Sequence, residues 1–442
     1  MINEKGTNEL SGSEANWFEQ KLDHFTPLDT RTFQQRYYVN DTYYQEGGPI
    51  LLFLGGEGQL SSFWVKDGLV LNLARQFNGT VVALEHRYYG QSQPFGAFTV
   101  SNLKYLSSLQ ALHDIPSFRR EFIEKYELQD DNNAWISFGC SYSGSLSLWL
   151  RNKFPNLIDG AYSGSSPVQA ELNYAQYDET CEEALGYSCK RYIEMAFDQI
   201  KELLNDKSGN GLKELENLFY TCQKLDSPTM INLFKYNVIS LIQFSVQYNN
   251  VQISYPRNEL CLQMARADDK LQQYAKMTRD LIGGECFDLS LDSLKVIAVH
   301  PENNGRTWWW QKATEFGYYK NSPPSSNIFF PEINGDFHNW VANQVFDTNI
   351  VPNVNYTNMI YGAKNPDVSN VIITNGVYDP WSKLSILEDL SPTVTSVLYS
   401  SSGHCAPVYS VSEDPATKTP QDVLDAIQKI QDFVKKIIDT KA

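Results

Sequence analysis

The chain has 442 residues, 42% of them hydrophobic, and its formal net charge is −16 at pH 7. That length exceeds what one simple core needs, so we expect one large domain with an insertion, or two domains. The negative charge argues against nucleic-acid binding and favours an acidic compartment, where protonated carboxylates relieve self-repulsion. No apolar run has the length of a membrane-spanning helix, so we expect no membrane association.

The first part of the chain reads as strands separated by helices. Aromatic and polar residues alternate over residues 33–39, which predicts edge strands of an antiparallel hairpin. Residues 50–54 (ILLFL) and 81–84 (VVAL) read as buried strands, and residues 63–77 and 106–126 carry helical patterns. This alternation predicts a mostly parallel, doubly wound α/β sheet.

A serine lies at a predicted turn between a strand and a helix. Residues 134–138 (AWISF) form a short apolar run, and residues 146–150 begin a helix-like pattern that Pro155 ends. Strand, sharp turn and helix with a serine at the turn are typical of a nucleophile elbow. The usual pattern is G-x-S-x-G, whereas here Ser143 stands in the last place and the glycine follows as Gly144. The pattern therefore predicts an exposed nucleophile at Ser141, with an ordinary serine turn as the alternative.

Residues 55–58 (GGEG) follow the first buried strand. In a fold with a nucleophile elbow, the loop after an early strand supplies a backbone N–H to the oxyanion hole. Glycine there lets the backbone approach a substrate oxygen without a side chain in the way. The alternative is a glycine turn without a catalytic role.

The pattern changes after the strand expected at residues 161–165. Helical spacing dominates residues 181–204, 212–220, 230–247 and 259–282, with no clear strand between them. Strand character returns at residues 371–374 and 397–400, and an amphipathic helix ends the chain. We therefore expect a first part of the main domain at 1–167, a helical cap at 168–345 and a second part at 346–442.

The order of residues along the chain identifies a base and an acid for Ser141. A serine hydroxyl needs a base to take its proton and an acid to orient that base, and α/β-hydrolases place them in the order Ser, Asp, His after strands. Of the six histidines, only His404 follows both Ser141 and a convincing buried strand. Asp379 also follows a strand and precedes His404 by 25 residues. The sequence therefore predicts a Ser141–Asp379–His404 triad in an α/β-hydrolase fold.

At this point the chain resembles the prolyl carboxypeptidase family of serine peptidases, which includes lysosomal Pro-X carboxypeptidase, dipeptidyl peptidase II and thymus-specific serine protease. The resemblance covers nearly the whole chain. The segments that carry it are LDHF at 22–25, GGEG at 55–58, EHRYYGQSQPFG at 85–96, SYSG at 141–144, TEFGYY at 314–319, NGVYDPW at 375–381 and HC at 404–405.

The resemblance implies an α-helical cap domain and a peptide substrate cut after proline. It assigns Ser141 as nucleophile, Asp379 as orienting acid and His404 as base. Backbone oxyanion donors are expected at Tyr142 and Gly56, with Glu57 as an alternative to Gly56. Because proline is rigid and lacks an N–H, we expect flat aromatic walls to select it. The candidates for that pocket are Trp308, Trp309, Trp310, Phe316, Tyr318 and Trp381.

Two positions bear on which end of the substrate is recognised. Pro-X carboxypeptidase carries a second histidine and an arginine after its catalytic histidine, whereas this chain has Cys405, Ala406 and Pro407. No cation for a substrate carboxylate is therefore supplied there. Glu57 offers a carboxylate for a substrate amino terminus instead, as in a dipeptidyl peptidase, or is structural. Aminodipeptidase, carboxypeptidase and endopeptidase action all stay open.

Seven cysteines show no zinc-type spacing, so we expect no metal, and triad chemistry requires no cofactor. The five at 181, 189, 222, 261 and 286 indicate disulfides of unknown pairing and a secreted or lysosomal protein. Sequons at Asn40, Asn78 and Asn355 agree with a glycoprotein. If Ser141 and His404 lie within hydrogen-bond reach, their neighbours Cys140 and Cys405 are close enough for a disulfide. The same Cys-Ser, Asp, His-Cys arrangement resembles the motif of tannases and feruloyl esterases.

Two other classes of protein remain as alternatives. A carboxylesterase or lipase uses the same triad, although HRYYG and DPW disfavour it. A non-catalytic binding protein with a retained pocket is disfavoured by an intact triad. The residues leave both a monomer and a homodimer open.

Overall fold

The computed structural model describes residues 14–128, 132–249, 255–413 and 418–441. Eight strands form one sheet in the order β1-β2-β4-β3-β5-β6-β7-β8. Only the pairs β1–β2 and β2–β4 are antiparallel, and the remaining strands run parallel. The strands are β1 Asn16–Lys21, β2 Thr32–Asn40, β3 Ile50–Leu54, β4 Thr80–Leu84, β5 Trp135–Cys140, β6 Gly160–Gly164, β7 Val371–Gly376 and β8 Val394–Tyr399.

The mostly parallel sheet and the antiparallel hairpin at its edge confirm the fold predicted from the sequence, an α/β-hydrolase fold. β3, β4, β5, β6 and β7 are buried at every position, because helices cover both faces of a parallel sheet. Their carboxyl ends meet at one edge of the sheet. The loops after β3, β5, β7 and β8 therefore converge, and these loops carry the residues predicted to be catalytic.

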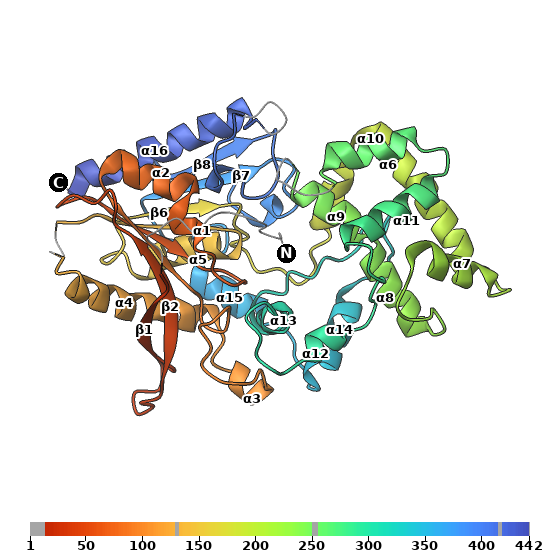
Figure 1. Cartoon of the computed structure of the whole chain (residues 1–442), viewed down its shortest axis with the longest axis horizontal. Helices are drawn as coiled ribbons and strands as arrows, with labels where there is room; N and C mark the ends of the chain where they lie inside the picture. Colours follow the sequence, from red (N-terminus) through yellow and green to blue (C-terminus); the bar gives the residue numbers. More distant parts are fainter. Residues whose placement is uncertain (1–13, 129–131, 250–254, 414–417, 442) are drawn as a thin grey trace.

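Two cores lie on opposite faces of the sheet. Alternate residues of one strand divide between them: Leu51 and Phe53 belong to one, and Ile50 and Leu52 to the other. The first core contains the apolar faces of α2 (Gly68–Phe77) and α16 (Gln421–Lys441), which lie together in Figure 1. The second contains those of α4 (Ser108–Lys125) and α5 (Tyr142–Lys153). The short elements are α1 Phe63–Lys66, α3 Val100–Leu103, η2 Ser382–Leu384 and η3 Ala406–Val408.

The single helix predicted over residues 63–77 is wrong, because the structure divides it into α1 and α2. Gly68 has a φ of +83°, which a side chain rarely adopts, and Asp67 caps α2 by accepting a hydrogen bond from Gly68 N. This turn places Trp64 of α1 against Phe53, with the two rings stacked 4.2 Å apart.

Between β6 and β7 the described residues form helices and no strand of the sheet. Figure 1 shows α6 to α11 as a separate layer beside the sheet, with α12 to α14 below it. Tyr361 of α15 stacks on Trp149 of α5 at 4.0 Å, so the chain has returned to the main domain by that helix. The helices are α6 Gln176–Leu204, α7 Asn210–Phe219, α8 Pro228–Val238, α9 Ser240–Gln247, α10 Arg257–Arg266, α11 Lys270–Leu281, α12 Asp292–Lys295, α13 Gly305–Gln311, the π-helical η1 Lys312–Phe316, α14 Gly335–Phe346 and α15 Val354–Tyr361.

These helices agree with the predicted cap at 168–345, whose boundaries stay a prediction. Two details were wrong. Residues 230–247 form two helices, α8 and α9, and residues 259–282 also form two, α10 and α11. Asp269 caps the second of the latter pair by accepting from Gln272 N.

Two disulfides brace the cap, Cys189–Cys261 and Cys222–Cys286. Cys181 is a buried free thiol. Burial raises the pKa of this thiol well above its usual value, so it stays protonated. These pairings answer the question that the sequence left open.

The two charged residues of the EHRYYG segment, Glu85 and Arg87, each form a buried ion pair. Glu85 pairs with Arg36 at 2.5 Å. Arg87 pairs with Asp114 on α4, and His24 of the LDHF segment hydrogen-bonds to the same carboxylate at 2.8 Å. Removing one partner of a buried pair leaves an uncompensated charge. These two motifs therefore join the loop after β4 to β2 and α4. No helix in the part of the chain that the structure describes is both long and apolar enough to cross a membrane.

Candidate active site

Ser141 occupies a strained turn between β5 and α5. Its φ and ψ are 62° and −134°, a conformation that a non-glycine residue adopts only when its surroundings impose it. A Cβ on Gly139 would lie 2.1 Å from Ser143 O, and one on Gly144 would lie 2.7 Å from Gly164 O. Small residues are therefore required on both sides of the serine, which is the geometry expected of a nucleophile elbow.

Ser143 replaces the last glycine of the usual G-x-S-x-G pattern. Its hydroxyl donates to Cys140 O and accepts from Cys140 N, both at 2.9 Å. The side chain is thereby folded back on the turn that precedes it. This local pairing explains why a serine fits at that position.

Asp379 and His404 form a buried pair at the ends of β7 and β8. His404 Nδ1 lies 2.7 Å from Asp379 Oδ2, and the two side chains are 3% and 0% exposed. A carboxylate accepts, so Nδ1 carries the proton and Nε2 is left with a free lone pair. Nε2 is buried and has no hydrogen-bond partner among the described residues. The imidazole is thus oriented to accept a proton at Nε2.

Ser141 and His404 line the same cavity, of about 200 Å³. Gly56 and Glu57 from the loop after β3 also line it, as do aromatic side chains from three other segments. Among the described residues that line the cavity there is no lysine or arginine, and Glu57 is the one with a carboxylate. Its other lining residues are Phe53, Gly55, Gly58, Gln59, Leu60, Trp64, Cys140, Ser143, Tyr248, Cys405, Val408 and Tyr409.

The carboxyl group of Glu57 sits close to the predicted nucleophile and base. Burial raises its pKa above the usual 4.5, and its own backbone N–H, the charge of His404 and a hydrogen bond with Ser141 oppose that rise. An acidic side chain in contact with the reacting groups and poorly solvated is positioned to bind a cation.

The residues predicted as oxyanion donors lie beside Ser141. Tyr142 is the first residue of α5, so its N–H has no partner within the helix. A Cβ on Gly56 would lie 3.3 Å from Ser143 Cβ, which brings the glycine loop against the elbow. The backbones of both predicted donors therefore lie next to the elbow, and their role in the oxyanion hole stays a prediction.

A buried network holds the Tyr142 side chain. Its hydroxyl lies 3.0 Å from His86 Nε2 and accepts from Gln311 Nε2 at 2.9 Å. His86 Nδ1 donates to the Arg87 carbonyl, so in the neutral ring Nε2 accepts from the Tyr142 hydroxyl. Burial lowers the pKa of His86 to about 4, which keeps it neutral over most of the pH range. Nothing in the sequence indicated that Gln311, a cap residue, would reach the elbow.

Glu315 anchors the same cap segment to the main domain. Its carboxylate accepts from Ser108 N at 3.0 Å and from Ser108 Oγ at 2.6 Å, at the first turn of α4. No lysine or arginine pairs with it among the residues that the structure describes. Burial therefore raises the pKa of Glu315 to about 7.

We expect Glu315 to make stability depend on pH. The folded pKa of about 7 exceeds the usual 4.5, so the ionised form is disfavoured in the fold. The contribution of protonated Glu315 to the free energy of unfolding is fully present below pH 4.5. It is lost as the pH rises from 4.5 to about 7. Between these values the free energy of unfolding of wild type should fall by about 3 kcal/mol relative to Glu315→Gln.

Denaturant unfolding of both proteins at several pH values measures this difference. Other titrating groups are shared by the two proteins and cancel in the comparison. A difference that stays constant between pH 4.5 and 7 would refute the role assigned to this carboxyl.

The structure separates the six aromatic residues predicted for the proline pocket. Trp308, Phe316 and Tyr318 contact one another, and the first two also contact Tyr142 at 5.5 and 5.3 Å. Trp381 joins the group through Tyr318, at 5.4 Å. None of the four lines the 200 Å³ cavity.

The other two tryptophans face elsewhere. Trp309 contacts Tyr319 and His338, and Trp310 contacts Phe346 on α14. Neither has a ring contact with Tyr142 among the described residues. Consecutive helical residues point in directions about 100° apart, so one tryptophan of three reaches the elbow.

Cys140 and Cys405 form a disulfide, with their Cα atoms 5.8 Å apart. It joins the residue before Ser141 to the residue after His404.

The aromatic residues Trp64, Tyr248 and Tyr409 of the cavity were not singled out from the sequence, because no local pattern marks them.

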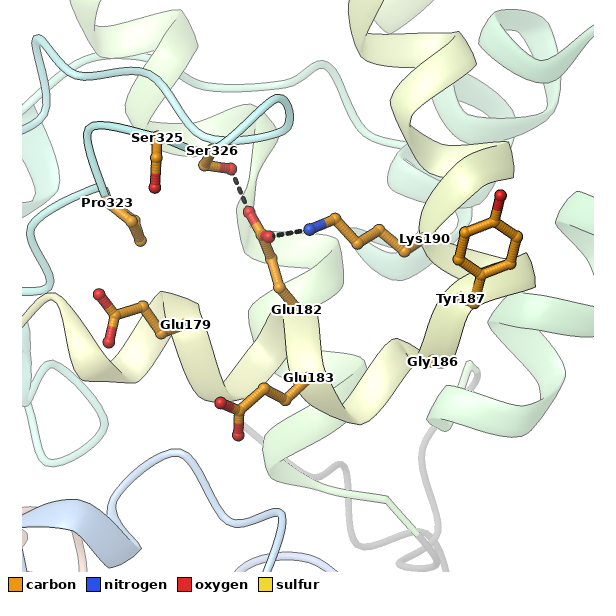
Figure 2. Close-up of a pocket in the computed structure, with 9 residues that line it drawn as sticks. All are labelled: Glu179, Glu182, Glu183, Gly186, Tyr187, Lys190, Pro323, Ser325 and Ser326. Carbon is orange, nitrogen blue, oxygen red and sulfur yellow. Dashed lines mark hydrogen bonds and ion pairs between the residues drawn. The ribbon is translucent and has the colours of Figure 1, made fainter.

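A second cavity, of about 390 Å³, opens on the cap between α6 and the segment at 323–326. Figure 2 shows Glu182 bridging Lys190 and Ser326 there, with Glu179 and Glu183 on the same helix. This cavity shares no lining residue with the one at Ser141.

The comparisons with known proteins agree in their class. A family model described as "Serine carboxypeptidase S28" matches residues 20–420. The chain is 32% identical over 430 residues to "Putative serine protease K12H4.7" of Caenorhabditis elegans, covering 89% of this chain and 83% of the relative. It is 30% identical to the mouse "Thymus-specific serine protease" (95% and 87% covered) and 28% identical to the mouse "Lysosomal Pro-X carboxypeptidase" (86% and 81% covered).

Proposed function

The chain belongs to the Serine carboxypeptidase S28 family of serine peptidases, and from that premise we propose that it cleaves peptides after proline with a Ser141–His404–Asp379 triad. The observation that carries the triad is the buried 2.7 Å bond between Asp379 and His404, with Nε2 of His404 unpaired beside the Ser141 cavity. The family match also disfavours the esterase alternative.

In the proposed reaction, Ser141 Oγ attacks the carbonyl carbon of the proline residue while His404 Nε2 takes the hydroxyl proton. Asp379 keeps Nδ1 protonated and stabilises the imidazolium that forms. His404 then gives the proton to the leaving amine, and an acyl-enzyme on Ser141 remains. Water then attacks that ester while the same nitrogen takes its proton, and His404 returns the proton to Ser141 Oγ as the carboxylic acid product leaves. The N–H groups of Tyr142 and Gly56 are our choice for binding the oxyanion, because such donors act where negative charge develops.

We assign proline recognition to the cluster of Trp308, Phe316, Tyr318 and Trp381. Its supporting feature is contact with Tyr142, the residue next to the nucleophile. Aromatic faces suit a rigid ring with no N–H to satisfy, at roughly 1–3 kcal/mol per well-placed contact. Trp309 and Trp310 are left out of this assignment because their ring contacts lie elsewhere.

Trp308→Ala should lower the preference for proline over alanine substrates by roughly 10- to 100-fold, because one wall of the pocket is lost. Trp310→Ala is the matched control: it removes the same kind of side chain two residues further along α13 and should cost stability without changing the preference. The ratio of kcat/KM for paired Pro and Ala peptides measures the effect. Equal ratios in wild type and Trp308→Ala would place the proline pocket elsewhere.

We further propose that Glu57 binds the amino terminus of the substrate, so the enzyme removes an amino-terminal dipeptide. The support is the charge of the cavity: it has a carboxylate beside Ser141 and no lysine or arginine to receive a substrate carboxylate. A half-buried carboxylate is stabilised by an opposite charge, and a protonated amine supplies it. The relative named Pro-X carboxypeptidase represents the competing mode of action.

One experiment tests both proposals. A decapeptide with proline as its second and ninth residues is incubated in free and Nα-acetylated forms, and the fragments are identified by mass spectrometry. We expect the amino-terminal dipeptide to be released from the free peptide, at least tenfold faster than from the acetylated one. Glu57→Gln should reduce that ratio towards one, because the paired charge is lost.

Other fragments would give other answers. Release of the single residue after the second proline would indicate a carboxypeptidase and overturn the role of Glu57. Cleavage after residues other than proline would overturn the proline specificity.

We propose a secreted or lysosomal location. Three disulfides in the described chain favour an oxidising compartment. Of the three sequons, Asn78 and Asn355 are exposed, whereas the Asn40 side-chain amide donates to Val65 O at 2.7 Å. The first two are therefore the positions accessible to glycosylation.

A further inference from the structure

The carboxyl end of cap helix α9 touches the loop that carries His404. His404 N donates to Gln247 O at 2.7 Å, and Gly403 N donates to Asn249 O at 3.0 Å. A Cβ on Gly403 would lie 2.4 Å from Gln247 O, so this close approach requires glycine. Two backbone hydrogen bonds therefore join the end of α9 to consecutive residues of the loop that carries His404.

The side chain of Gln247 reaches the other loop, which carries Asp379. Gln247 Oε1 accepts from the Trp381 indole N–H at 3.1 Å and from the Tyr177 hydroxyl at 2.5 Å. The backbone N–H of Trp381 in turn donates to Asp379 Oδ1 at 3.0 Å. Asp379 thus has one oxygen on His404 and the other on the residue that Gln247 holds.

Gln247 itself is not in contact with the reacting groups. It is 9% exposed and does not line the 200 Å³ cavity, although its neighbour Tyr248 does. One cap residue therefore contacts the acid loop through its side chain and the base loop through its backbone. Apart from Gln247, the hydrogen bonds that join these two loops in the described structure include the one between His404 and Asp379 and the one from Val377 N to Tyr399 O at 2.8 Å.

We propose that Gln247 is a positioning residue for catalysis: it holds the Asp379 and His404 loops in register, so the cap takes part in assembling the triad. The inference rests on the proposed function of that triad. Proton transfer from Ser141 depends on the placement of Nε2, and small displacements in such a site cost large factors in rate. The effect should fall on kcat, because the loops act on the reacting atoms and not on substrate binding.

Gln243 offers a matched control on the same helix. It lies one turn before Gln247, is also 9% exposed, and donates to Asp178 Oδ1 at 2.7 Å. Among the described residues it makes no hydrogen bond to either catalytic loop. Gln243→Met and Gln247→Met each remove one buried amide of the same size from α9, so their effects on folding should be similar.

The test measures kcat, KM, melting temperature and the rate of fluorophosphonate labelling of Ser141. For Gln247→Met we expect kcat and the labelling rate to fall by roughly 10- to 100-fold with KM within about threefold of wild type. Gln243→Met should keep the wild-type kcat at a comparable melting temperature. Gln247→Glu keeps an oxygen acceptor for Trp381 and Tyr177 and should recover most of the kcat.

A wild-type kcat in Gln247→Met, or equal losses in both Met variants, would overturn the proposal. If Gln247→Met does not fold, Gln247→Glu decides: a folded variant with a kcat as low as that of a triad variant contradicts the role of the acceptor. Failure of wild type to be labelled at Ser141 would instead overturn the proposed triad, so the two failures are distinguishable.

Discussion

Ser141→Ala, Asp379→Asn and His404→Ala should each lower kcat by on the order of 10⁴-fold or more while the fold is retained. The physical reason is that the three side chains act as one unit. Without Ser141 there is no acyl-enzyme, and without His404 the hydroxyl keeps its proton. Asparagine at 379 presents an amide that disfavours the Nδ1-protonated form of His404. Steady-state hydrolysis of a proline peptide measures the loss, and circular dichroism checks the fold.

The chain supplies a matched control for two of these changes. Ser145 lies one turn further along α5, and its buried hydroxyl has no hydrogen-bond partner among the described residues. His300 is exposed on the cap. Ser145→Ala and His300→Ala should therefore keep near-normal turnover. Near-normal turnover in Ser141→Ala would end the proposed mechanism.

Replacing both Cys140 and Cys405 by alanine should destabilise the protein and slow the reaction together. The disulfide closes a loop with a sequence separation of 265 residues, which the chain-entropy model converts to on the order of 5 kcal/mol. It also joins the backbone of the nucleophile to that of the base. Loss of that bond should reduce kcat by at least tenfold at a temperature where the variant is still folded.

The cap disulfide Cys189–Cys261 serves as the comparison, with a sequence separation of 72 residues. Its removal should cost about 4 kcal/mol in the same model but leave kcat close to wild type, because it lies between α6 and α10. Thermal unfolding and kcat of both double variants measure the two effects. A wild-type kcat in the folded Cys140/Cys405 variant would show that this disulfide has only a stabilising role.

The break between α8 and α9 illustrates what local pattern misses. Residues 230–247 carry one continuous helical period and contain neither glycine nor proline, so a single helix was predicted. The structure interrupts it at Ile239, and α9 then ends at the residues that contact Gly403 and His404. At this point the Val238 carbonyl accepts from the Tyr274 hydroxyl at 2.8 Å, a partner 36 residues away for which a sequence window has no signal.

The run of three tryptophans illustrates the same limit at the level of side chains. Its composition indicated an aromatic wall, but which ring faces Tyr142 depends on the rotation of α13 about its axis. That rotation is determined partly by Gln311, which bonds to Tyr142 and Tyr89, and by Glu315, which bonds to Ser108. These partners lie more than 160 residues away along the chain, so the periodicity of the segment carries no information about them.

By itself the sequence determined the α/β order of strands and helices, the helical insertion, the elbow at Ser141 and the order Ser, Asp, His. It did so because buried strands, small residues at a tight turn and helical periodicity are local properties, and because parallel strands bring the loops at their carboxyl ends to one edge. Only the tertiary structure decided that Glu57 faces Ser141, that Trp308 and not Trp310 adjoins the elbow, and that Gln247 joins the two catalytic loops. Those contacts depend on how the cap docks on the sheet, which is an outcome of packing between residues far apart in the chain.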